Sequence, residues 1–378
     1  MTTTVHAPSA AEVMNDPLQI PTPAMVIDLA RVERNLQRMI DYTRMQGLAL
    51  RPHTKTHKSR RMGARQIELG AVGLTVAKVD EAQVMADVAD DLLIAYPALD
   101  PYRTTRIAEL AQRVTVRVAV DSAQACDALA DRARAHGTTV GILVDLDVGF
   151  HRTGVQSPEA ALALAQHVDR TAGLRLDGLF CFPGQLFGSF DEQADDLAQI
   201  NQLFQQAIDL WRRHGLEAAI VSGGSTPGGF HSHHITALTE IRPGTYIYND
   251  VNCIGSTACT VEQCAATVMA TVVSNAVPGK VVVDAGSKSL TRERYTRDAA
   301  LEGHGRVVEL PDARVVRLSE EHGEIDIARC ERQPALGQRL HIIPVHVCPS
   351  INLHDRVWLR HPDGRYEPSP VDARGRVC

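Results

Sequence analysis

Residues 48–59 of the 378-residue chain read Leu-Ala-Leu-Arg-Pro-His-Thr-Lys-Thr-His-Lys-Ser, an apolar run that leads directly into basic and imidazole side chains. We predict a buried strand over residues 48–52, with Lys55 just beyond its carboxyl end. Burial disfavours the charged form of a lysine, and a neutral amine can form a Schiff base. The alternative is a solvated basic patch that binds nucleic acid. This segment alone supports both interpretations.

Similar apolar, β-branched runs recur along the chain, with helical spacing between them. Eight strands are predicted, at residues 48–52, 73–76, 92–96, 114–120, 140–146, 176–181, 219–222 and 238–241. Eight alternations of strand and helix predict a TIM (β/α)8 barrel rather than an open doubly wound sheet. We place the barrel at residues 25–255.

The pattern of residue types changes after the predicted barrel. Valine- and isoleucine-rich runs alternate with turns such as Pro278-Gly279 and Pro311-Asp312, and helical periodicity is weak. This pattern predicts a second, smaller, β-rich domain made of residues 256–378 together with residues 1–24.

Composition narrows the class of protein. The chain carries a net charge of -6, with 44% hydrophobic and 22% charged residues, as is ordinary for a globular protein. A net negative charge argues against nucleic-acid binding. Residues 1–17 lack a signal-peptide pattern, no run is apolar enough to span a membrane, and the eight cysteines form no C-x-x-C pair. We therefore expect a cytoplasmic protein with reduced thiols.

Two loops follow the last predicted barrel strands, where TIM barrels often bind phosphate. The first contains Gly223, Gly224, Ser225 and Thr226, whose amides and hydroxyls can surround an anion. The second contains Arg242-Pro243-Gly244-Thr245-Tyr246. Most glycine-rich loops hold nothing, so the position of the first loop after the seventh strand carries this prediction.

Two further sets of residues are candidates for binding a metal or a cofactor, and each also has an ordinary structural explanation. His346 and Cys348 follow an apolar run, and in extended chain their side chains would share a face and could bind one metal ion. Taken alone, such a pair is more often an ordinary surface histidine beside a buried cysteine. Arg152 follows the fifth strand, where it could meet a cofactor oxygen or simply lie in solvent.

Taken in order, these segments resemble the fold-type III pyridoxal 5'-phosphate (PLP) enzymes of the D-threonine aldolase and D-serine dehydratase family, which are related to the barrel of alanine racemases. The similarity extends from about Thr22 to the last twenty residues or so. It rests on Thr22-Pro23-Ala24, the residues from Arg51 to Lys58, the loop from Gly223, the loop from Arg242, Glu321-His322-Gly323, and His346-Val347-Cys348 with Asn352-Leu353-His354-Asp355.

The resemblance implies roles for these residues. Lys55 would hold PLP as a Schiff base, with His53 as a second catalytic candidate. Residues 223–226 and Tyr246 would bind the cofactor phosphate, and Arg152 its phenolic oxygen. His346 and Cys348 would bind a divalent metal, Zn²⁺ or Mn²⁺. The resemblance also implies a homodimer.

Family members act on D-amino acids with a β-hydroxyl group. The resemblance favours retro-aldol cleavage to glycine and an aldehyde, with β-elimination to a keto acid and ammonia as the alternative. His-x-Cys is dehydratase-like, whereas Asn352-Leu353-His354-Asp355 is aldolase-like. After the sixth strand, Phe182-Pro183-Gly184 lacks the histidine of the aldolases, so cleavage would need another base, with His304, His322 or His354 as candidates.

Two other classes stay open on the sequence. An amino-acid racemase would need a second acid or base opposite Lys55, for which Tyr295 is the candidate. A non-catalytic PLP-binding protein would need neither the β-rich domain nor the His346 and Cys348 pair.

Overall fold

The computed structural model describes residues 13–378, which divide into two compact units. The first comprises residues 36–246, 256–259 and 375–378, and the second comprises residues 13–35, 247–255 and 260–374. Residues 1–12, on which part of the signal-peptide prediction rests, lie outside the described residues. Each unit is described separately below.

The first unit is built on eight parallel strands, as predicted. They are hydrogen-bonded in the order β2-β9-β8-β7-β6-β5-β4-β3. Their bounds are β2 (Ala49–Leu50), β3 (Leu74–Val76), β4 (Asp91–Ile94), β5 (Thr115–Val120), β6 (Val140–Asp145), β7 (Leu174–Phe180), β8 (Ile220–Gly223) and β9 (Glu240–Ile241).

The two edges of this sheet meet, so the sheet closes into a barrel. His53, just after β2, forms a parallel bridge with Thr75 of β3. The amide of Thr75 donates to the carbonyl oxygen of Pro52 at 2.9 Å. The predicted TIM barrel is confirmed.

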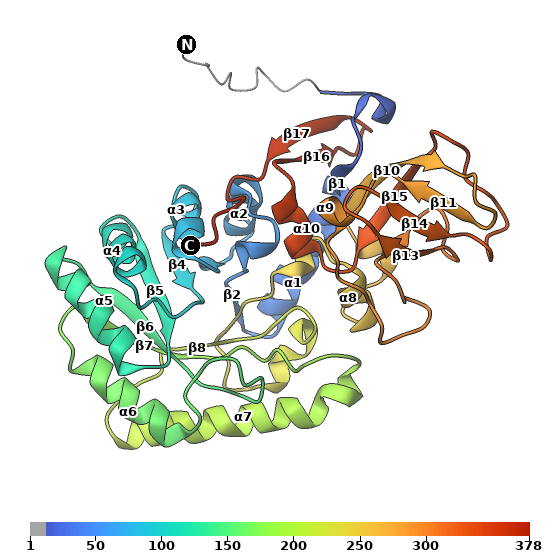
Figure 1. Ribbon diagram of the computed structural model, residues 1–378. Helices are drawn as coiled ribbons and strands as arrows, with labels where there is room; N and C mark the ends of the chain where they lie inside the picture. Colours follow the sequence, from blue (N-terminus) through green and yellow to red (C-terminus); the bar gives the residue numbers. More distant parts are fainter. Residues whose placement is uncertain (1–12) are drawn as a thin grey trace, which may run out of the picture. The chain divides into compact units, whose positions relative to one another are not determined.

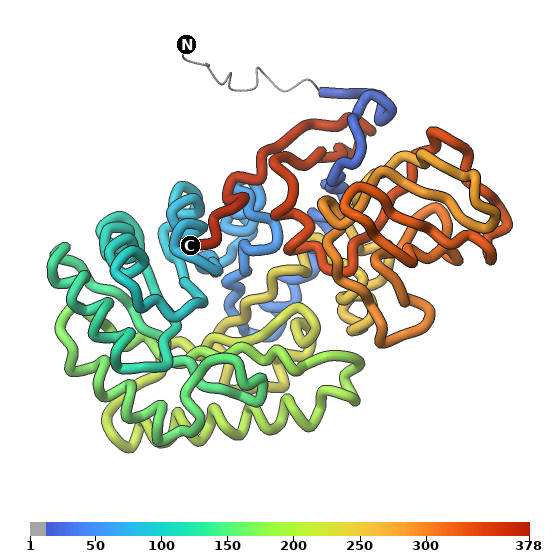
Figure 2. Tube along the Cα trace, in the orientation of Figure 1, coloured from blue at the N-terminus to red at the C-terminus, as the bar shows by residue number. Residues whose placement is uncertain are grey.

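Helices connect successive strands and lie outside them (Figure 1). They are α2 (Arg60–Glu68), α3 (Val79–Met85), α4 (Pro101–Leu110), α5 (Ala123–Ala135), α6 (Pro158–Asp169) and α7 (Phe190–Arg213), while α1 (Leu29–Met45) precedes β2 and contains the division between the units. Helix starts follow capping rules: Asp100 accepts from the amide of Arg103 at 3.1 Å, and Ser189 and Glu192 form a capping box. The alternation of strand and helix can be followed along the trace in Figure 2.

A buried ion pair joins the first strand of the barrel, β2, to the last, β9. Arg51, which follows β2, contacts Glu240 of β9 with an Nε–Oε2 distance of 2.9 Å, and also contacts Asp91 of β4 at 2.6 Å. Ser222 of β8 donates to Glu240 at 2.5 Å. Because an unpaired buried charge is costly, this network requires all of its members to be present.

The second unit contains a nine-stranded sheet, which confirms the predicted β-rich domain. Its strands are β1 (Ala24–Asp28), β10 (Ala266–Ser274), β11 (Lys280–Val283), β12 (Gly305–Val307), β13 (Arg314–Leu318), β14 (Gly323–Asp326), β15 (Arg339–Pro344), β16 (Arg356–Arg360) and β17 (Tyr366–Pro370). The short helices α8 (Val251–Gly255), α9 (Ser287–Leu290) and α10 (Val347–Leu353) complete it.

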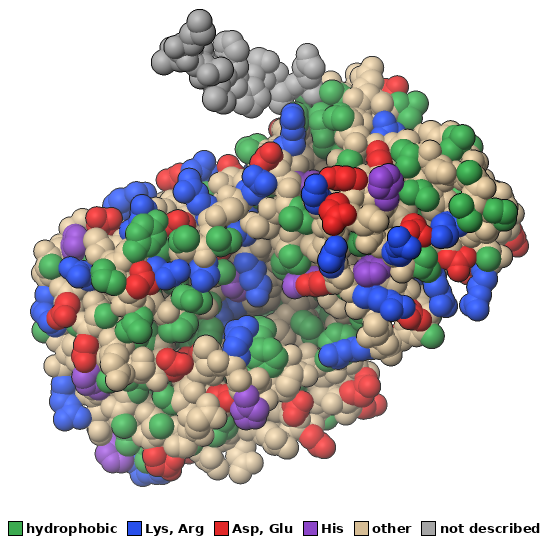
Figure 3. Space-filling model, viewed as in Figure 1, with side chains coloured by type: hydrophobic (Ala, Val, Ile, Leu, Met, Phe, Trp, Pro, Cys, Tyr) green, Lys and Arg blue, Asp and Glu red, His purple; other side chains and the backbone are tan. Residues whose placement is uncertain are grey.

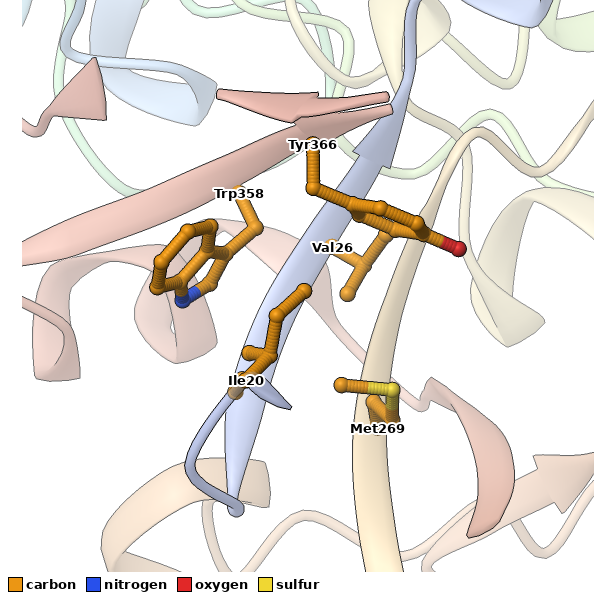
Figure 4. Close-up of a cluster of buried hydrophobic side chains, with 6 residues drawn as sticks. Ile20, Val26, Met269, Trp358 and Tyr366 are labelled. Atoms are coloured by element: carbon orange, nitrogen blue, oxygen red, sulfur yellow. The ribbon is translucent and has the colours of Figure 1, made fainter. Parts of the chain in front are cut away.

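Strand β1 lies inside this second sheet, antiparallel to β10 and parallel to β16. Around it, Ile20, Val26, Met269, Trp358 and Tyr366 form a buried apolar cluster (Figure 4). The chain before the barrel and the chain after it are therefore parts of one core.

The described residues contain no helix that is long and apolar enough to cross a membrane. On the face shown in Figure 3, acidic and basic side chains are interspersed.

We expect Glu240→Ala to destabilise the barrel by about 3 kcal/mol, because it leaves the buried Arg51 guanidinium without its main partner. Urea unfolding would be followed by the fluorescence of Trp211, a buried residue of α7, in a Trp358→Phe background that removes the only other tryptophan. The control, Glu68→Ala, removes an exposed ion pair with Arg65 and should cost less than about 1 kcal/mol. Equal losses in the two variants would contradict a structural role for the buried pair.

Candidate active site

The predicted lysine lies at the carboxyl end of the barrel strands. Lys55 is in a short 3-10 turn, η2 (Thr54–Thr56), that follows β2, and it is partly buried. Its Nζ is 5.7 Å from the centroid of the Phe182 ring, and the guanidinium of Arg152 is 4.3 Å from the same centroid. The barrel thus brings Lys55 and Arg152, almost one hundred residues apart, beside one aromatic ring after β7.

A buried carboxylate anchors the turn that carries Lys55. Glu81 of α3 accepts a hydrogen bond from the hydroxyl of Thr54 at 2.8 Å and one from the amide of Ala77 at 2.9 Å. Burial raises the pKa of Glu81, and the nearby charges of Lys58 and Lys55 oppose that shift. The hydrogen bond from Thr54 to Glu81 therefore helps to fix the turn that carries Lys55.

His53 is buried at the start of the same turn, and its Nδ1 accepts from the amide of Lys55 at 3.4 Å. Burial lowers the pKa of His53 well below its usual value, and the positive charges of Lys55 and Arg242 lower it further. The imidazole is therefore neutral near pH 7.

The predicted anion-binding residues lie together. Ser225 and Thr226 are buried in the loop after β8, and Thr226 accepts from the amide of Tyr246 at 3.2 Å. A Cβ on Gly223 would come within 2.7 Å of Leu238, and Gly224 has a positive φ of +79°. A larger residue at position 223 would displace the Leu238 side chain, and the backbone conformation at position 224 favours glycine.

Tyr246 lies in η4 (Thr245–Ile247), a short 3-10 turn that follows β9. Its hydroxyl accepts a hydrogen bond from Gln66 at 3.0 Å. Burial raises the pKa of Tyr246, so the hydroxyl stays protonated.

Sequence reasoning quoted Arg242 but gave it no role, and the structure places it inside the barrel mouth. Its guanidinium lies 3.8 Å from the centroid of the Phe180 ring and donates to the Ser222 hydroxyl at 2.6 Å. Burial lowers the pKa of Arg242 to about 10, so it remains a cation at neutral pH. An arginine that ends a barrel strand is the signal that could have identified it.

Asp145, at the end of β6, is a second residue that sequence reasoning missed. It is buried and accepts from the hydroxyl of Thr153 at 2.8 Å. Burial raises its pKa to about 6, although the Thr153 hydrogen bond acts in the opposite direction. A carboxyl group that titrates near neutrality can exchange protons in this pH range.

In the second unit, the argument that His346 and Cys348 share a face of an extended chain is wrong, because Cys348 lies in α10. His346 is the extended residue that caps this helix. The two side chains are nevertheless within hydrogen-bonding reach of each other. The start of the helix, rather than a strand, brings the imidazole and the thiol together.

Two carboxylates hold this pair in place. His346 Nδ1 is 3.2 Å from Glu293 Oε1, and Asp250 accepts from the amide of Val347 at 3.0 Å. Burial alone would lower the pKa of His346, but hydrogen bonds to Cys348 and Glu293 raise it to about 11. Among residues 13–378 there is no group of three or more histidine, cysteine or acidic side chains arranged to hold a metal. Any metal here would keep open positions for water or substrate.

The histidines considered as replacement bases also lie in the second unit. His354 Nε2 is 3.3 Å from the carbonyl oxygen of Ser289, and His304 Nδ1 is 3.0 Å from that of Glu293. His322 is exposed in the turn between β13 and β14. Tyr295 is buried, and a Cβ on Gly255 would come within 2.0 Å of its hydroxyl oxygen.

Two family models match the chain. The alanine racemase N-terminal domain matches residues 27–251, and a putative serine dehydratase domain matches residues 265–359. D-threo-3-hydroxyaspartate dehydratase from Delftia sp. (strain HT23) is 35% identical over 354 residues, covering 88% of this chain and 92% of that protein. D-threonine aldolase from Arthrobacter sp. is 30% identical over 347 residues, covering 90% of this chain and 89% of that protein.

Solved structures give the same result. The D-threonine aldolase from Filomicrobium marinum superposes with a TM-score of 0.88 at 32% identity, covering 96% of this chain and 98% of that one. The Delftia dehydratase superposes with a TM-score of 0.85 at 30% identity, covering 93% and 98%. A D-threo-3-hydroxyaspartate dehydratase variant in which a cysteine is replaced by alanine was solved in the metal-free form.

We expect the barrel to lose stability as the pH falls from about 6.5 toward 4, in part because of His57. Burial lowers the pKa of His57 to about 4 in the folded protein, whereas the unfolded value is about 6.5. In this range the unfolded chain binds the proton and the folded chain does not, so the free energy of unfolding falls by up to about 1.4 kcal/mol for each pH unit.

Urea unfolding of the barrel between pH 7 and 5 would measure this effect. His57→Gln should flatten the dependence, while His214→Gln, at an exposed position, should leave it unchanged. A His57→Gln profile as steep as that of the parent protein would refute the assignment.

Proposed function

Because this chain belongs to the family of PLP-dependent lyases that contains D-threonine aldolases and D-threo-3-hydroxyaspartate dehydratases, we propose that it acts, with PLP and a divalent metal, on D-amino acids bearing a β-hydroxyl group. The observation that carries the proposal is the convergence of Lys55, Arg152 and the buried loop residues Ser225 and Thr226 at one end of the barrel.

The residues at the barrel mouth fit this cofactor. Lys55 would hold its aldehyde carbon covalently, and residues 223–226 with Tyr246 would surround its phosphate. The positive φ of Gly224 and the buried hydroxyls of Ser225 and Thr226 suit an anion that is bound by backbone amides and hydroxyl groups. When bound, PLP supplies an electron sink for the bond that breaks at Cα or Cβ of the substrate.

Side chains at and near Lys55 would then remove a proton from the substrate and stabilise negative charge. The Lys55 amine would be the base for the substrate Cα proton. Arg152 and Arg242 would provide fixed positive charge, and His53, which is neutral near pH 7, would add no further positive charge beside Lys55.

His346 and Cys348 fit a divalent metal, because an imidazole and a thiolate together suit Zn²⁺ and similar ions. Such a metal would supply a Lewis acid for the β-hydroxyl of the substrate. The metal-free cysteine variant of the dehydratase supports this assignment by analogy.

Between the two reactions, the available groups favour β-elimination. Elimination needs a base for Cα, which Lys55 provides, and a Lewis acid for the departing hydroxyl. Retro-aldol cleavage needs instead a base for the hydroxyl proton, and Phe182-Pro183-Gly184 offers none. The resemblance at residues 352–355 and the aldolase relatives keep cleavage as the second candidate. A racemase is disfavoured, since the hydroxyl of its candidate acid, Tyr295, is packed against Gly255.

We expect Lys55→Ala to abolish the visible absorption of the lysine-bound cofactor and to reduce turnover at least about 1,000-fold, because the proposal assigns the covalent bond to the amine of Lys55. The melting temperature without cofactor should stay within a few degrees of the parent value. Lys288→Ala, at an exposed position, is the control. Turnover in the Lys55 variant close to that of the control would overturn the assignment.

Product analysis tests the reaction itself, using PLP with Zn²⁺ or Mn²⁺ and D-threonine, D-serine and D-threo-3-hydroxyaspartate as substrates. A keto acid with ammonia is the expected result, and glycine with an aldehyde would instead establish cleavage. Chelation of the metal, or Cys348→Ala, should lower activity with either product. Full activity in metal-stripped protein would remove the metal from the proposal.

A further inference from the structure

The lysine segment and the loop that contains Tyr246 are packed directly against each other. The amide of His53 donates to the carbonyl oxygen of Pro243 at 3.0 Å. A Cβ on Gly244 would lie 3.0 Å from the carbonyl oxygen of His53 and 3.1 Å from the hydroxyl of Thr56. The two segments are therefore tightly packed against each other at Gly244.

A chain of buried hydrogen bonds also connects these segments. The amide of Ser59 donates to His57 Nδ1 at 3.0 Å. His57 Nε2 is 3.2 Å from Gln66 Oε1, and Gln66 Nε2 donates to the Tyr246 hydroxyl at 3.0 Å. His57, Gln66 and Tyr246 are all almost completely buried.

The direction of every bond in this chain follows from its first member. A backbone amide can only donate, so His57 Nδ1 must carry a lone pair, and the single proton of the neutral ring lies on Nε2. That N–H requires an acceptor, which assigns the oxygen of Gln66 to the histidine and its NH₂ group to Tyr246. The Tyr246 oxygen therefore accepts, and its own hydrogen points away from Gln66.

The protonation states agree with this geometry. Burial lowers the pKa of His57 to about 4, although its hydrogen bonds to Gln66 and Ser59 oppose the shift, so the ring is neutral at physiological pH. Burial raises the pKa of Tyr246, which keeps its hydroxyl protonated.

We propose that His57 and Gln66 are positioning residues that fix Tyr246 and thereby set the spacing between Lys55 and the phosphate-binding loop. This inference rests on the proposed function, in which Lys55 and residues 223–226 with Tyr246 hold the two ends of PLP. A cofactor held at two points binds tightly only when those points are already spaced correctly, because ordering them during binding reduces affinity. The chain ties Tyr246 to the lysine segment, and Tyr246 in turn donates its amide to Thr226 of the loop.

The test is a double-mutant cycle on cofactor affinity. PLP would be titrated into cofactor-free protein and followed by visible absorption for the parent, His57→Leu, Tyr246→Phe and the double variant. Each single variant should weaken binding about tenfold, as expected for the loss of a buried hydrogen bond. The double variant should bind PLP about as tightly as each single variant, because either change alone already breaks the chain of hydrogen bonds.

Two further variants separate positioning from stability. Gln66→Glu keeps an acceptor for His57 and can accept from the Tyr246 hydroxyl, so it should retain more affinity than Gln66→Leu. Gln112→Leu removes an exposed glutamine and should bind PLP normally. If His57→Leu fails to fold, the cycle of Gln66→Leu with Tyr246→Phe gives the same information.

The possible failures are distinguishable. A parent protein that does not bind PLP at Lys55 would refute the proposed function. If the parent binds PLP but the His57 and Gln66 variants bind equally well, or if their effects multiply with that of Tyr246→Phe, the positioning role is refuted and the proposed function stands.

Discussion

The barrel depends on the buried ion pair between Arg51 and Glu240. Arg51 directly follows β2 and Glu240 lies on the neighbouring strand β9, at the position where the first strand of the barrel meets the last. Removing either partner would leave an uncompensated charge in the interior, so the pair favours this one pairing of strands. Arg51 also contacts Asp91 on β4, which carries the same constraint past the seam where the sheet closes.

The location of this pair explains why the chemistry-bearing segments come together. Arg51 directly precedes Pro52 and the turn with Lys55, and Glu240 directly precedes the segment with Arg242 and Tyr246. Once β2 and β9 are paired in register, the residues after each strand emerge side by side at the carboxyl end of the barrel. The contact of His53 with Pro243 and the tight packing of Gly244 follow from that register.

In the second unit, the start of a helix rather than the end of a strand brings the candidate side chains together. The first residues of α10 orient His346 and Cys348. Asp250 accepts from the amide between them, and Glu293 contacts the imidazole. A metal-binding histidine commonly donates its second N–H to a carboxylate, which fixes its tautomer, and in the proposed metal site Glu293 would be that carboxylate. The acidic residues that support the pair come from segments about fifty and one hundred positions earlier in the chain.

The sequence by itself determined the number and order of the barrel strands, the β-rich character of the second domain and the main candidate residues. These features are local: apolar periodicity marks each strand, and glycine, lysine and histidine stand in recognisable short motifs. The role of Lys55 and its partners is still a proposal, but their identity was readable from the residues alone.

Tertiary structure alone decided how the groups are paired and protonated. Glu81, Asp145 and Gln66 stand in unremarkable helix and strand positions, and nothing in their neighbouring residues marks them. Their contacts with Thr54, Thr153 and Tyr246 depend on how the folded barrel arranges its loops, and burial in the folded barrel is the main cause of the pKa shifts of Glu81, Asp145 and Tyr246. The pairing of His346 with Cys348 was predicted for the wrong reason, because a helix that starts at an extended cap cannot be distinguished from a strand by two residues of spacing.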